Sequence, residues 1–496
     1  MSQESPHDSQ VIKNEPLTSK ELKGWYAYYF ASGAYDNATI GLFIPIVLEN
    51  LASQAGYEVD KLDTPCDITK SIHTCVVKFG VGYVDTASYS LYIIALTAFL
   101  QCILLISSSP FADHGANRKN FLLTYSYIGA ISTSLFSLII KAGGPFDSYV
   151  IAGILTIVSN CCFGAAFVFY LSYIPIYSRI HTDVISQKKT EDKVATELSI
   201  NMMTAGFIAG LLSIIGGLGI VTGLNESNSS IQYAVSLGGI WWFVWLTIPL
   251  FLLKKHPRPP LPSTENLFLY PYKRIFKTLK SARKLWQTMK FLIAWSLISD
   301  GINIIGPLSA LFIKVELGLS DQKLVILAII VPITAVIGDY LFHSIEKYYG
   351  FSIKAMVLIN SVILSLLPTY TLVGFIAPFG LRQQWEVWLF VSYFGLSLGS
   401  IQAYYQAMFS ILIPKGHESE FFSLFLITAK GSSWMGPLIT GAITNVTHNI
   451  RSGFLFIIFM LLVSCIIMWT VDVEKGKHDA EDFINNEMEE NTENTE

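Results

Sequence analysis

Apolar stretches long enough to cross a membrane recur along this chain from one end to the other. A helix needs about 20 predominantly apolar residues to span the hydrocarbon core of a bilayer. Only 14% of the residues are charged, whereas soluble proteins have about 25%. A single large soluble core does not account for so many long stretches. The pattern therefore predicts an all-α membrane protein with many transmembrane helices.

We expect twelve spans, arranged as two six-helix halves around a central break in hydrophobicity. This is the architecture of major facilitator type transporters. The predicted spans cover residues 25–50, 88–110, 121–141, 148–177, 195–221, 232–253, 290–314, 321–343, 353–375, 386–413, 419–444 and 452–471.

The polar segments outside the spans complete the predicted domain organisation. The first 20 residues contain no apolar core of a signal peptide, so we expect no cleavable signal and a cytosolic N-terminus. The last 25 residues are acidic and are predicted to be disordered. The predicted units are a cytosolic tail (1–24), an N-terminal bundle (25–253), a cytosolic linker (254–289), a C-terminal bundle (290–471) and an acidic cytosolic tail (472–496).

The linker combines a proline-rich stretch, KKHPRPPLPST, with a basic segment that has apolar residues at helical spacing. Such a segment is typical of a helix that lies on anionic lipid, but it is equally typical of a plain topology determinant. Both readings place the linker in the cytosol. The basic residues of this segment are Lys273, Arg274, Lys277, Lys280, Arg283 and Lys284.

Three independent signals give the same orientation. Lysine and arginine collect in the loops on the linker side, and positive charge marks the cytosolic side. The opposite loops carry Cys66 and Cys75, which are predicted to form a disulfide, and the glycosylation sequons at Asn225 and Asn228. Disulfides and glycans both belong to an oxidising, non-cytosolic space. We therefore expect both termini in the cytosol.

The two predicted halves share a short motif in corresponding turns. Gly-x-x-x-Lys occurs in the turn between spans 2 and 3 and again between spans 8 and 9. We expect each charged turn to hold neighbouring helices together at the cytosolic edge and to control conformational switching rather than substrate binding. The predicted switch residues are Asp113, Gly115, Arg118, Lys119, Gly350 and Lys354.

Polar residues inside the spans concentrate in spans 1, 4, 7 and 10, which is every third helix. An ionised side chain at mid-bilayer costs roughly 2.5–3.5 kcal/mol on insertion scales, so such residues should line water or substrate. Four helices that line a central cavity are typical of a twelve-helix transporter. The predicted substrate or ion pathway residues are Asp36, Asn37, Asn160, Asp300, Asn303, Gln402, Tyr405, Gln406 and Lys430.

Asp36 has two readings that can both hold. It faces a water-filled path, or it forms a structural ion pair, with Lys430 as the first candidate partner and Asp300 as the competitor for that lysine. Lys430 lies in ITAKGSSWMGP, whose small residues suit close helix contact.

An enzymatic reading has little support. GLSLG at 395–399 matches the nucleophile elbow of esterases, but that motif needs a strand–turn–helix setting, and here it lies inside an apolar span. The sequence has no metal-ligand spacing and no phosphate-binding glycine loop. We therefore expect no catalytic residues, no cofactor, no metal and no nucleic-acid partner.

Several long stretches resemble the fungal autophagy-related protein 22 family of the major facilitator superfamily. They include ELKGWYAYYFASGAY, NCCFGAAFVFYLSYIPIY, GGIWWFVWLTIPLFLL, SLGSIQAYYQAMFSILIPKG and EFFSLFLITAKGSSWMGPLITG. The resemblance covers nearly all of residues 21–476. It implies a multi-pass permease of the vacuole membrane that exports amino acids such as leucine and tyrosine after autophagic breakdown. It leaves proton coupling and oligomeric state open.

Three positions depart from the family pattern. The family usually has Glu-Pro where this chain has Gly33-Ala34, arginine where Gln406 stands, and aspartate where Ala429 stands. Two acids and one base are therefore missing together, and Asp36, one helical turn after Gly33, is the candidate to replace part of them. Substrate choice and ion coupling depend on this difference, whereas the fold does not.

Two alternatives to amino-acid export remain open from the sequence. One is a facilitator-type transporter of another small solute, such as a peptide, sugar or drug. The other is a membrane receptor or scaffold whose cavity no longer transports. In each case the bilayer surrounds the chain.

Overall fold

The structure is a computed structural model of the chain. It describes residues 16–59, 61–66, 75–80, 82–115, 117–139, 145–224, 229–256, 270–273, 284–319, 321–431, 435–447 and 449–493. The sequons at Asn225 and Asn228 and most of the linker, 257–269 and 274–283, lie outside these residues.

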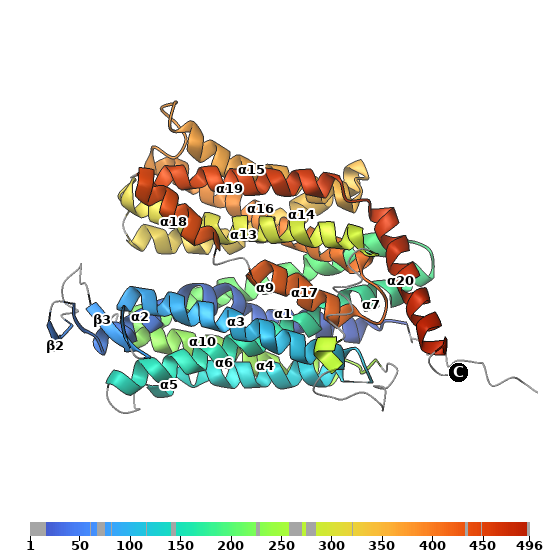
Figure 1. Cartoon of the computed structure of the whole chain (residues 1–496), viewed down its shortest axis with the longest axis horizontal. Helices are drawn as coiled ribbons and strands as arrows, with labels where there is room; N and C mark the ends of the chain where they lie inside the picture. Colours follow the sequence, from blue (N-terminus) through green and yellow to red (C-terminus); the bar gives the residue numbers. More distant parts are fainter. Residues whose placement is uncertain are drawn as a thin grey trace, which may run out of the picture.

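The helices form two bundles that lie side by side, one from each half of the sequence (Figure 1). The N-terminal bundle contains α1 (Ser19–Ala34), η1 (Tyr35–Phe43), α2 (Ile44–Gln54), α3 (Thr86–Ala112), α4 (Arg118–Ser134), α5 (Phe136–Ile139), α6 (Pro145–Leu171), α7 (Tyr173–Ile180), α8 (Thr182–Ile185), α9 (Glu191–Gly223), α10 (Ser230–Trp245) and α11 (Thr247–Leu252). The C-terminal bundle contains α13 (Trp286–Val315), α14 (Asp321–Tyr349), α15 (Ile353–Val373), α16 (Gln384–Leu412), α17 (Glu418–Gly431), α18 (Met435–Thr447), η3 (Ile450–Ser452) and α19 (Gly453–Trp469).

Within the described ranges, nine helices are long and apolar enough to cross a membrane. The other three predicted spans correspond to the consecutive helices α1–η1–α2, to α16, and to α17 with α18. The helical membrane fold predicted from the sequence is confirmed, and the count of twelve spans is consistent with it.

The two bundles touch along two lines. On one line, α9 of the N-terminal bundle packs against α14 and α16. On the other, α17 of the C-terminal bundle packs against α3 and α6. These contacts decide which side chains of one half can reach the other half.

Glycines permit the closest helix contacts within each bundle. A Cβ on Gly33 would lie 2.5 Å from the Cα atom of Gly206, so α1 and α9 approach backbone to backbone. In the C-terminal bundle, a Cβ on Gly395 would lie 2.6 Å from the carbonyl oxygen of Val331. The sequence GLSLG is thus a packing surface of α16 inside the bundle.

A small antiparallel sheet covers the loop between spans 1 and 2, and the sequence analysis did not predict it. Its strands are β1 (Tyr57–Glu58), β2 (Lys61–Pro65), β3 (Cys75–Phe79) and β4 (Gly82–Asp85), in the order β2-β1-β3-β4. Cys66 and Cys75 form a disulfide beside it, with Cα atoms 5.7 Å apart. We call this end of the molecule the disulfide face. The opposite end, with Lys119, Lys354 and His256, is the linker face.

The prediction of a disordered acidic tail is wrong for most of its length. Residues Val473–Glu493 form helix α20, which crosses the linker face from the C-terminal bundle (Figure 1). Ala480 and Phe483, three residues apart on one face, are 5% and 6% exposed, and the ring of Phe483 meets the edge of His417 at 5.4 Å. The acidic composition concealed this narrow apolar face, which tertiary packing stabilises.

Candidate functional site

Asp36 lies where span 1 changes its helical geometry. Residues Tyr35–Phe43 form a π-helix between α1 and α2, and Asp36 stands in its first turn. The hydroxyl of Thr39 donates to the carbonyl of Ala34, five residues back, at 3.3 Å. The wider turns of π-helices are frequent at functional sites because they re-aim side chains. Here the change occurs at the only acid of the predicted span 1 that lies away from its ends.

The carboxylate of Asp36 has partners from both halves of the molecule. The hydroxyl of Tyr29 on α1 donates to its Oδ2 atom at 2.8 Å. Tyr29 is held in turn by ring contacts with Phe167 and Tyr170, with centroids 5.4 and 5.8 Å away. From α17, the positive charge of Lys430 attracts the carboxylate electrostatically. An acid of one bundle and a base of the other therefore act on each other.

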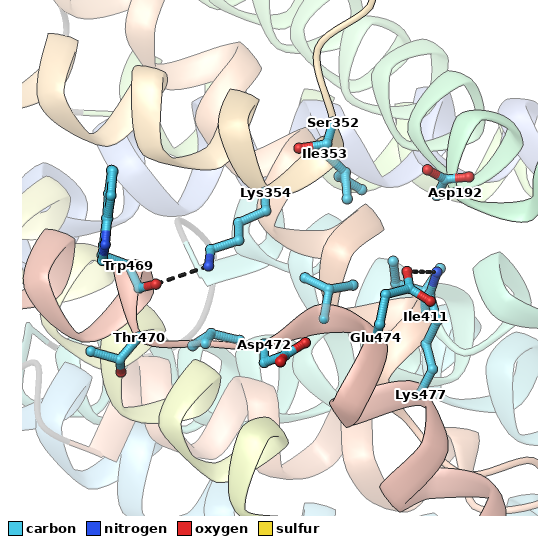
Figure 2. Close-up of a pocket in the computed structure, with 12 residues that line it drawn as sticks. Asp192, Ser352, Ile353, Lys354, Ile411, Trp469, Thr470, Asp472, Glu474 and Lys477 are labelled. Carbon is cyan, nitrogen blue, oxygen red and sulfur yellow. Dashed lines mark hydrogen bonds and ion pairs between the residues drawn. The ribbon is translucent and has the colours of Figure 1, made fainter.

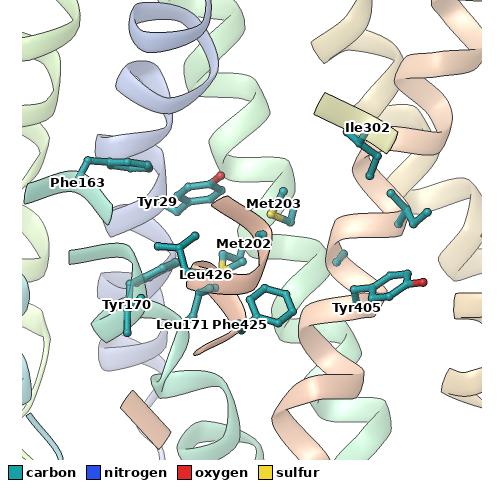
Figure 3. Close-up of a cluster of buried hydrophobic side chains, with 14 of the residues drawn as sticks. Tyr29, Phe163, Tyr170, Leu171, Met202, Met203, Ile302, Tyr405, Phe425 and Leu426 are labelled. Carbon is teal, nitrogen blue, oxygen red and sulfur yellow. The ribbon is translucent and has the colours of Figure 1, made fainter. Parts of the chain in front are cut away.

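A cluster of aromatic and aliphatic side chains lies between the bundles (Figure 3). Tyr29, Tyr170 and Met203 come from the N-terminal half, and Phe425 and Leu426 from α17. Trp295 of α13 stacks on Phe425 at 4.4 Å and donates its indole hydrogen to the carbonyl of the same residue at 3.1 Å. These contacts fix α17 on α13, and thereby position Lys430 five residues further on.

Some of the other predicted pathway residues serve helix packing. The amide of Asn37 donates to the carbonyls of Gly33 and Gly206, both at 3.2 Å, and so ties η1 to α1 and α9. The hydroxyl of Tyr405 lies 3.2 Å from that of Ser361 on α15. The polar groups of Asn37 and Tyr405 thus form hydrogen bonds to neighbouring helices.

The remaining pathway residues differ in exposure. Asp300 and Gln406 are buried, Asn160 and Gln402 are half-buried, and Asn303 is exposed. The amide oxygen of Gln406 has no hydrogen-bond partner in the part of the chain that is described. Lys430 is exposed. The structure therefore brings Asp36 within electrostatic range of Lys430 and leaves the Gln406 amide oxygen available, but it does not gather all nine residues at one point.

The predicted switch residue Asp113 connects the two bundles at the linker face. Its carboxylate accepts hydrogen bonds from the backbone N–H groups of Ser419 and Glu420, both at 3.0 Å. These groups belong to the first turn of α17, where a negative charge is stabilised by the helix dipole. Asp113 therefore caps a helix of the opposite half.

Two arginines of the N-terminal bundle complete this contact. Arg118 pairs with Asp113 and lies 3.4 Å from Glu418, and Arg179 of α7 lies 3.0 Å from Glu418. We call these four residues the first gate. Arg179 and Glu418 were not predicted, because each looks like an ordinary loop charge in sequence and their pairing spans 239 residues.

A second contact closes the linker face between α9 and α14, and we call it the second gate. Glu197 of α9 binds Lys347 of α14 at 3.4 Å and Lys189 at 2.6 Å. The hydrogen bond from Lys189 to this carboxylate raises the pKa of the lysine. Deeper in the same interface, Thr204 donates to Asp339 at 3.0 Å. The only sequence signal for Asp339 was an acid four residues before the predicted end of span 8.

The shared turn motif performs the same task in both halves. Gly115 and Gly350 both have positive φ, 62° and 66°, which glycine adopts without strain. Lys119 donates to the carbonyls of Leu250 and Leu253, at 2.7 and 2.6 Å. Lys354 donates in the same way to the carbonyl of Trp469 at the end of α19. Each turn thus places a lysine at the carbonyl end of the last helix of its own bundle.

Lys354 lies at the edge of a cavity of about 490 Å³ under α20 (Figure 2). Its ammonium donates to the carbonyl of Trp469 at 2.8 Å. Asp192 of the N-terminal bundle and Glu474 of α20 also line this space. The predicted switch residues Lys119, Gly350 and Lys354 therefore stabilise each bundle, and only Asp113 and Arg118 reach across. Among the described residues, no group of three His, Cys, Asp or Glu side chains could hold a metal ion.

Solved structures of similar shape are transporters. The proton:xylose symporter XylE of the major facilitator superfamily superimposes with a TM-score of 0.64 at 12% identity, covering 93% of this chain and 98% of that one. A bacterial homologue of the iron transporter ferroportin, in an outward-facing state, gives 0.59 at 11% identity, covering 91% and 98%. At these identities the likeness shows the fold alone.

Sequence comparison is more specific. Autophagy-related protein 22-1 of Penicillium rubens is 30% identical and covers 94% of this chain and 92% of its own length. Autophagy-related protein 22 of Coccidioides immitis is 30% identical, covering 94% and 89%. A family model described as "Vacuole effluxer Atg22 like" matches residues 17–481. The chain therefore belongs to the Atg22-like vacuole effluxer family, and its fold is that of the major facilitator transporters.

Proposed function

We propose that this protein is a permease of the vacuole membrane that exports neutral amino acids, leucine and tyrosine among them, released by autophagic breakdown. The family to which the chain belongs supports a vacuolar effluxer. In this proposal the linker face and both termini are cytosolic and the disulfide face is lumenal. The Cys66–Cys75 disulfide at the opposite end from the linker supports that orientation.

The observation that supports the substrate class is the electrostatic proximity of Asp36 and Lys430, one from each bundle. An amino acid is a zwitterion, with an ammonium group and a carboxylate on one carbon atom. A site for it needs an acid and a base close together in an environment of low dielectric. Asp36 of the N-terminal bundle and Lys430 of the C-terminal bundle supply one of each, and they attract one another in the absence of substrate.

The positions of the two gates support a mechanism of alternating access. Both gates join the bundles at the linker face, so substrate leaves on that side only after both open. A zwitterion between Asp36 and Lys430 replaces their mutual attraction with two new ion pairs. Rocking of two bundles around a central site is the usual motion of such two-half transporters.

The departure at Gly33 has a structural reason in this packing. A side chain there would collide with the backbone of Gly206, since even a Cβ would lie 2.5 Å from its Cα atom. The acid therefore stands at position 36, on the π-helix, where the side chain is half-buried rather than pressed against α9.

The test is uptake of labelled leucine and tyrosine by proteoliposomes. Asp36→Asn and Lys430→Met should each lower uptake at least tenfold, and the double variant should lose less than the sum, because the second change removes a charge that has already lost its counter-charge. Asp300→Asn with Lys430→Met is the competing cycle. Lys323→Met, at the exposed start of α14 where the lysine donates to Gln384 at 3.2 Å, is the control.

Two results would contradict the proposal. Additive effects of Asp36→Asn and Lys430→Met, with coupling in the Asp300 cycle, would move the acid to α13. Uptake of a peptide or sugar in place of amino acids, or no uptake by a correctly folded protein, would favour the alternative transporter or a non-transporting receptor.

A further inference from the structure

Asp339 of α14 is a carboxylate in an unusual place. It is 0% exposed, in the middle of the interface between α14 and α9. Its Oδ2 atom accepts a hydrogen bond from Thr204 of the opposite bundle at 3.0 Å. In the described part of the chain its Oδ1 atom has no hydrogen-bond partner. The single partner of this buried group is thus a neutral hydroxyl that belongs to the other half.

The space around Oδ1 is closed by a glycine. A Cβ on Gly399 of α16 would lie 3.0 Å from Oδ1 of Asp339 and 2.6 Å from the carbonyl oxygen of Ala335. The absence of a side chain lets α16 press directly on the carboxyl group. Little room remains for a counter-charge or for solvating water.

No described residue forms an ion pair with Asp339, whose interactions are burial and the bond from Thr204. Lys347, the lysine of the second gate, lies eight residues further along α14, roughly 12 Å away along the helix axis. A carboxylate that is buried without a cation normally takes up a proton rather than remain charged. In this closed arrangement we therefore expect Asp339 to carry a proton.

Protonatable groups lie between Asp339 and the linker face. His343 and Glu346 follow it at i+4 and i+7 on the same face of α14. Glu346 accepts from the hydroxyl of Tyr404 at 2.7 Å and lies 3.0 Å from Nδ1 of His343. Tyr404 is near enough for the charge of Asp339 to act on it. The titratable groups that face this region are Tyr26 on α1, Glu197 on α9, Tyr404 on α16, and Tyr340, His343 and Glu346 on α14.

We propose that Asp339 is a proton-binding site, which is occupied while α9 packs on α14 and releases its proton toward the linker face when the two helices separate. On opening, the O–H bond of the carboxyl group breaks, and the proton passes by way of Tyr404, Glu346 and His343 to solution. The carboxylate that remains is then hydrated. On closing, it takes up one proton again before it is buried.

This inference rests on the proposed function only in that α9 and α14 separate during transport. By linkage, a proton bound more tightly in the closed form stabilises that form. Acid therefore favours closure of the second gate and alkali favours its opening. For one proton, the ratio of closed to open molecules changes by up to about tenfold per pH unit.

The test measures the distance between the linker ends of α9 and α14 by double electron–electron resonance. Spin labels are placed at Thr190→Cys and Tyr349→Cys, two exposed positions, with the four free cysteines replaced by alanine. The full chain in lipid nanodiscs is measured without substrate from pH 5.5 to 8.5. In the parent protein the short-distance population should fall as the pH rises.

Asp339→Asn, which resembles the protonated acid, should keep the short distance at every pH. Asp339→Glu should restore a pH dependence with a different midpoint, and it serves if the asparagine variant fails to fold. Glu197→Gln and His343→Gln remove two other titratable groups of the same interface. Because the distance is measured at equilibrium and does not depend on the route of the proton, both variants should retain the parent's pH dependence even if Glu197→Gln shifts the closed fraction.

The proposal is overturned if the distance in Asp339→Asn depends on pH as in the parent, or if the distance in Asp339→Glu does not depend on pH. It is also overturned if Glu197→Gln or His343→Gln alone removes the pH dependence. A parent protein without pH dependence overturns it as well. Because no substrate is present, failure of leucine transport, which would overturn the proposed function, leaves this outcome unaffected.

Discussion

The turns that follow spans 2 and 8 share a sequence motif but make different contacts. Both have a glycine with positive φ and a lysine that binds the carbonyl end of the last helix of its own bundle. In the first turn, Asp113 and Arg118 also reach α17 of the other bundle. At the corresponding positions of the second turn stand Tyr348 and Ile353. Both turns therefore stabilise the last helix of their own bundle. Of the two, the first turn alone also connects the halves.

The second interface is held by a different kind of contact. Glu197, Lys189 and Lys347 form surface ion pairs there, and Lys347 is 62% exposed. In the first gate the side chains of Asp113 and Glu418 are 0% exposed. Burial makes the first gate sensitive to the loss of a single member, whereas exposed ion pairs contribute little.

The largest expected effect comes from Asp113→Ala. It leaves the N–H groups of Ser419 and Glu420 without their acceptor and Arg118 with one partner fewer, so we expect the closed linker face to lose about 3–5 kcal/mol. Transport should slow more than tenfold, while equilibrium substrate affinity stays within a few-fold. Distances between spin labels across the first gate measure how far the linker face opens, and equilibrium binding measures the substrate affinity.

The matched control is Tyr348→Ala, at the corresponding position of the other turn. Tyr348 is 83% exposed, so its loss should change stability by less than about 0.5 kcal/mol. If the tyrosine variant opens the linker face as much as Asp113→Ala does, the two turns are not different in the way proposed.

A smaller effect is expected from Phe483→Ala on α20. This helix contacts the region of the first gate, because Phe483 packs on His417, which precedes the first turn of α17. Truncation of a buried phenylalanine should weaken docking of α20 by about 2 kcal/mol. Hydrogen exchange of residues 473–493 should speed up, and the exposed Asn485→Ala should leave it unchanged. Unchanged exchange in the phenylalanine variant would show that α20 is not held by this contact.

Lys119→Met and Lys354→Met should have equal and modest effects. Each removes a cation from the carbonyl end of a helix, an interaction of about 0.3–1 kcal/mol. We expect similar small decreases in the thermal unfolding temperature and no change in the distance between the bundles. A shift of that distance in one variant alone would mean that the lysine of that turn also controls the gate.

The smallest effect is expected from Lys347→Met in the second gate. An exposed ion pair contributes about 0–1 kcal/mol and is screened by salt. Transport should fall slightly at low ionic strength and match the parent at high ionic strength. A large decrease in transport that persists in high salt would show that the second gate contributes as much to closure of the linker face as the first gate.

Much of the architecture could be predicted from local sequence. Long apolar stretches, the position of basic residues and the repeated Gly-x-x-x-Lys turn led to the helical membrane fold and the two halves. The small sheet beside Cys66 and Cys75 and the helix α20 were not predicted, because both consist of short or polar segments that become ordered through tertiary contacts.

The candidate site could be predicted only in part. Asp36 and Lys430 stood out as charges in apolar spans, and Asp113 and Arg118 as charges in a repeated turn. Asn37 and Tyr405 looked the same in sequence, yet their polar groups bind neighbouring helices. Asp339 was passed over because it lies near the predicted end of a span, where a charge is ordinary.

The sequence by itself determined that the chain crosses a membrane, which face carries the positive charge and where its two halves begin. The thickness of the bilayer and the need to satisfy every backbone hydrogen bond leave few alternatives for such stretches. Tertiary structure alone decided which charges meet. Asp113 binds a backbone group 306 residues away, and Asp339 meets a hydroxyl 135 residues away. Each contact joins one bundle to the other, so only the packing of whole helices brings its two members together.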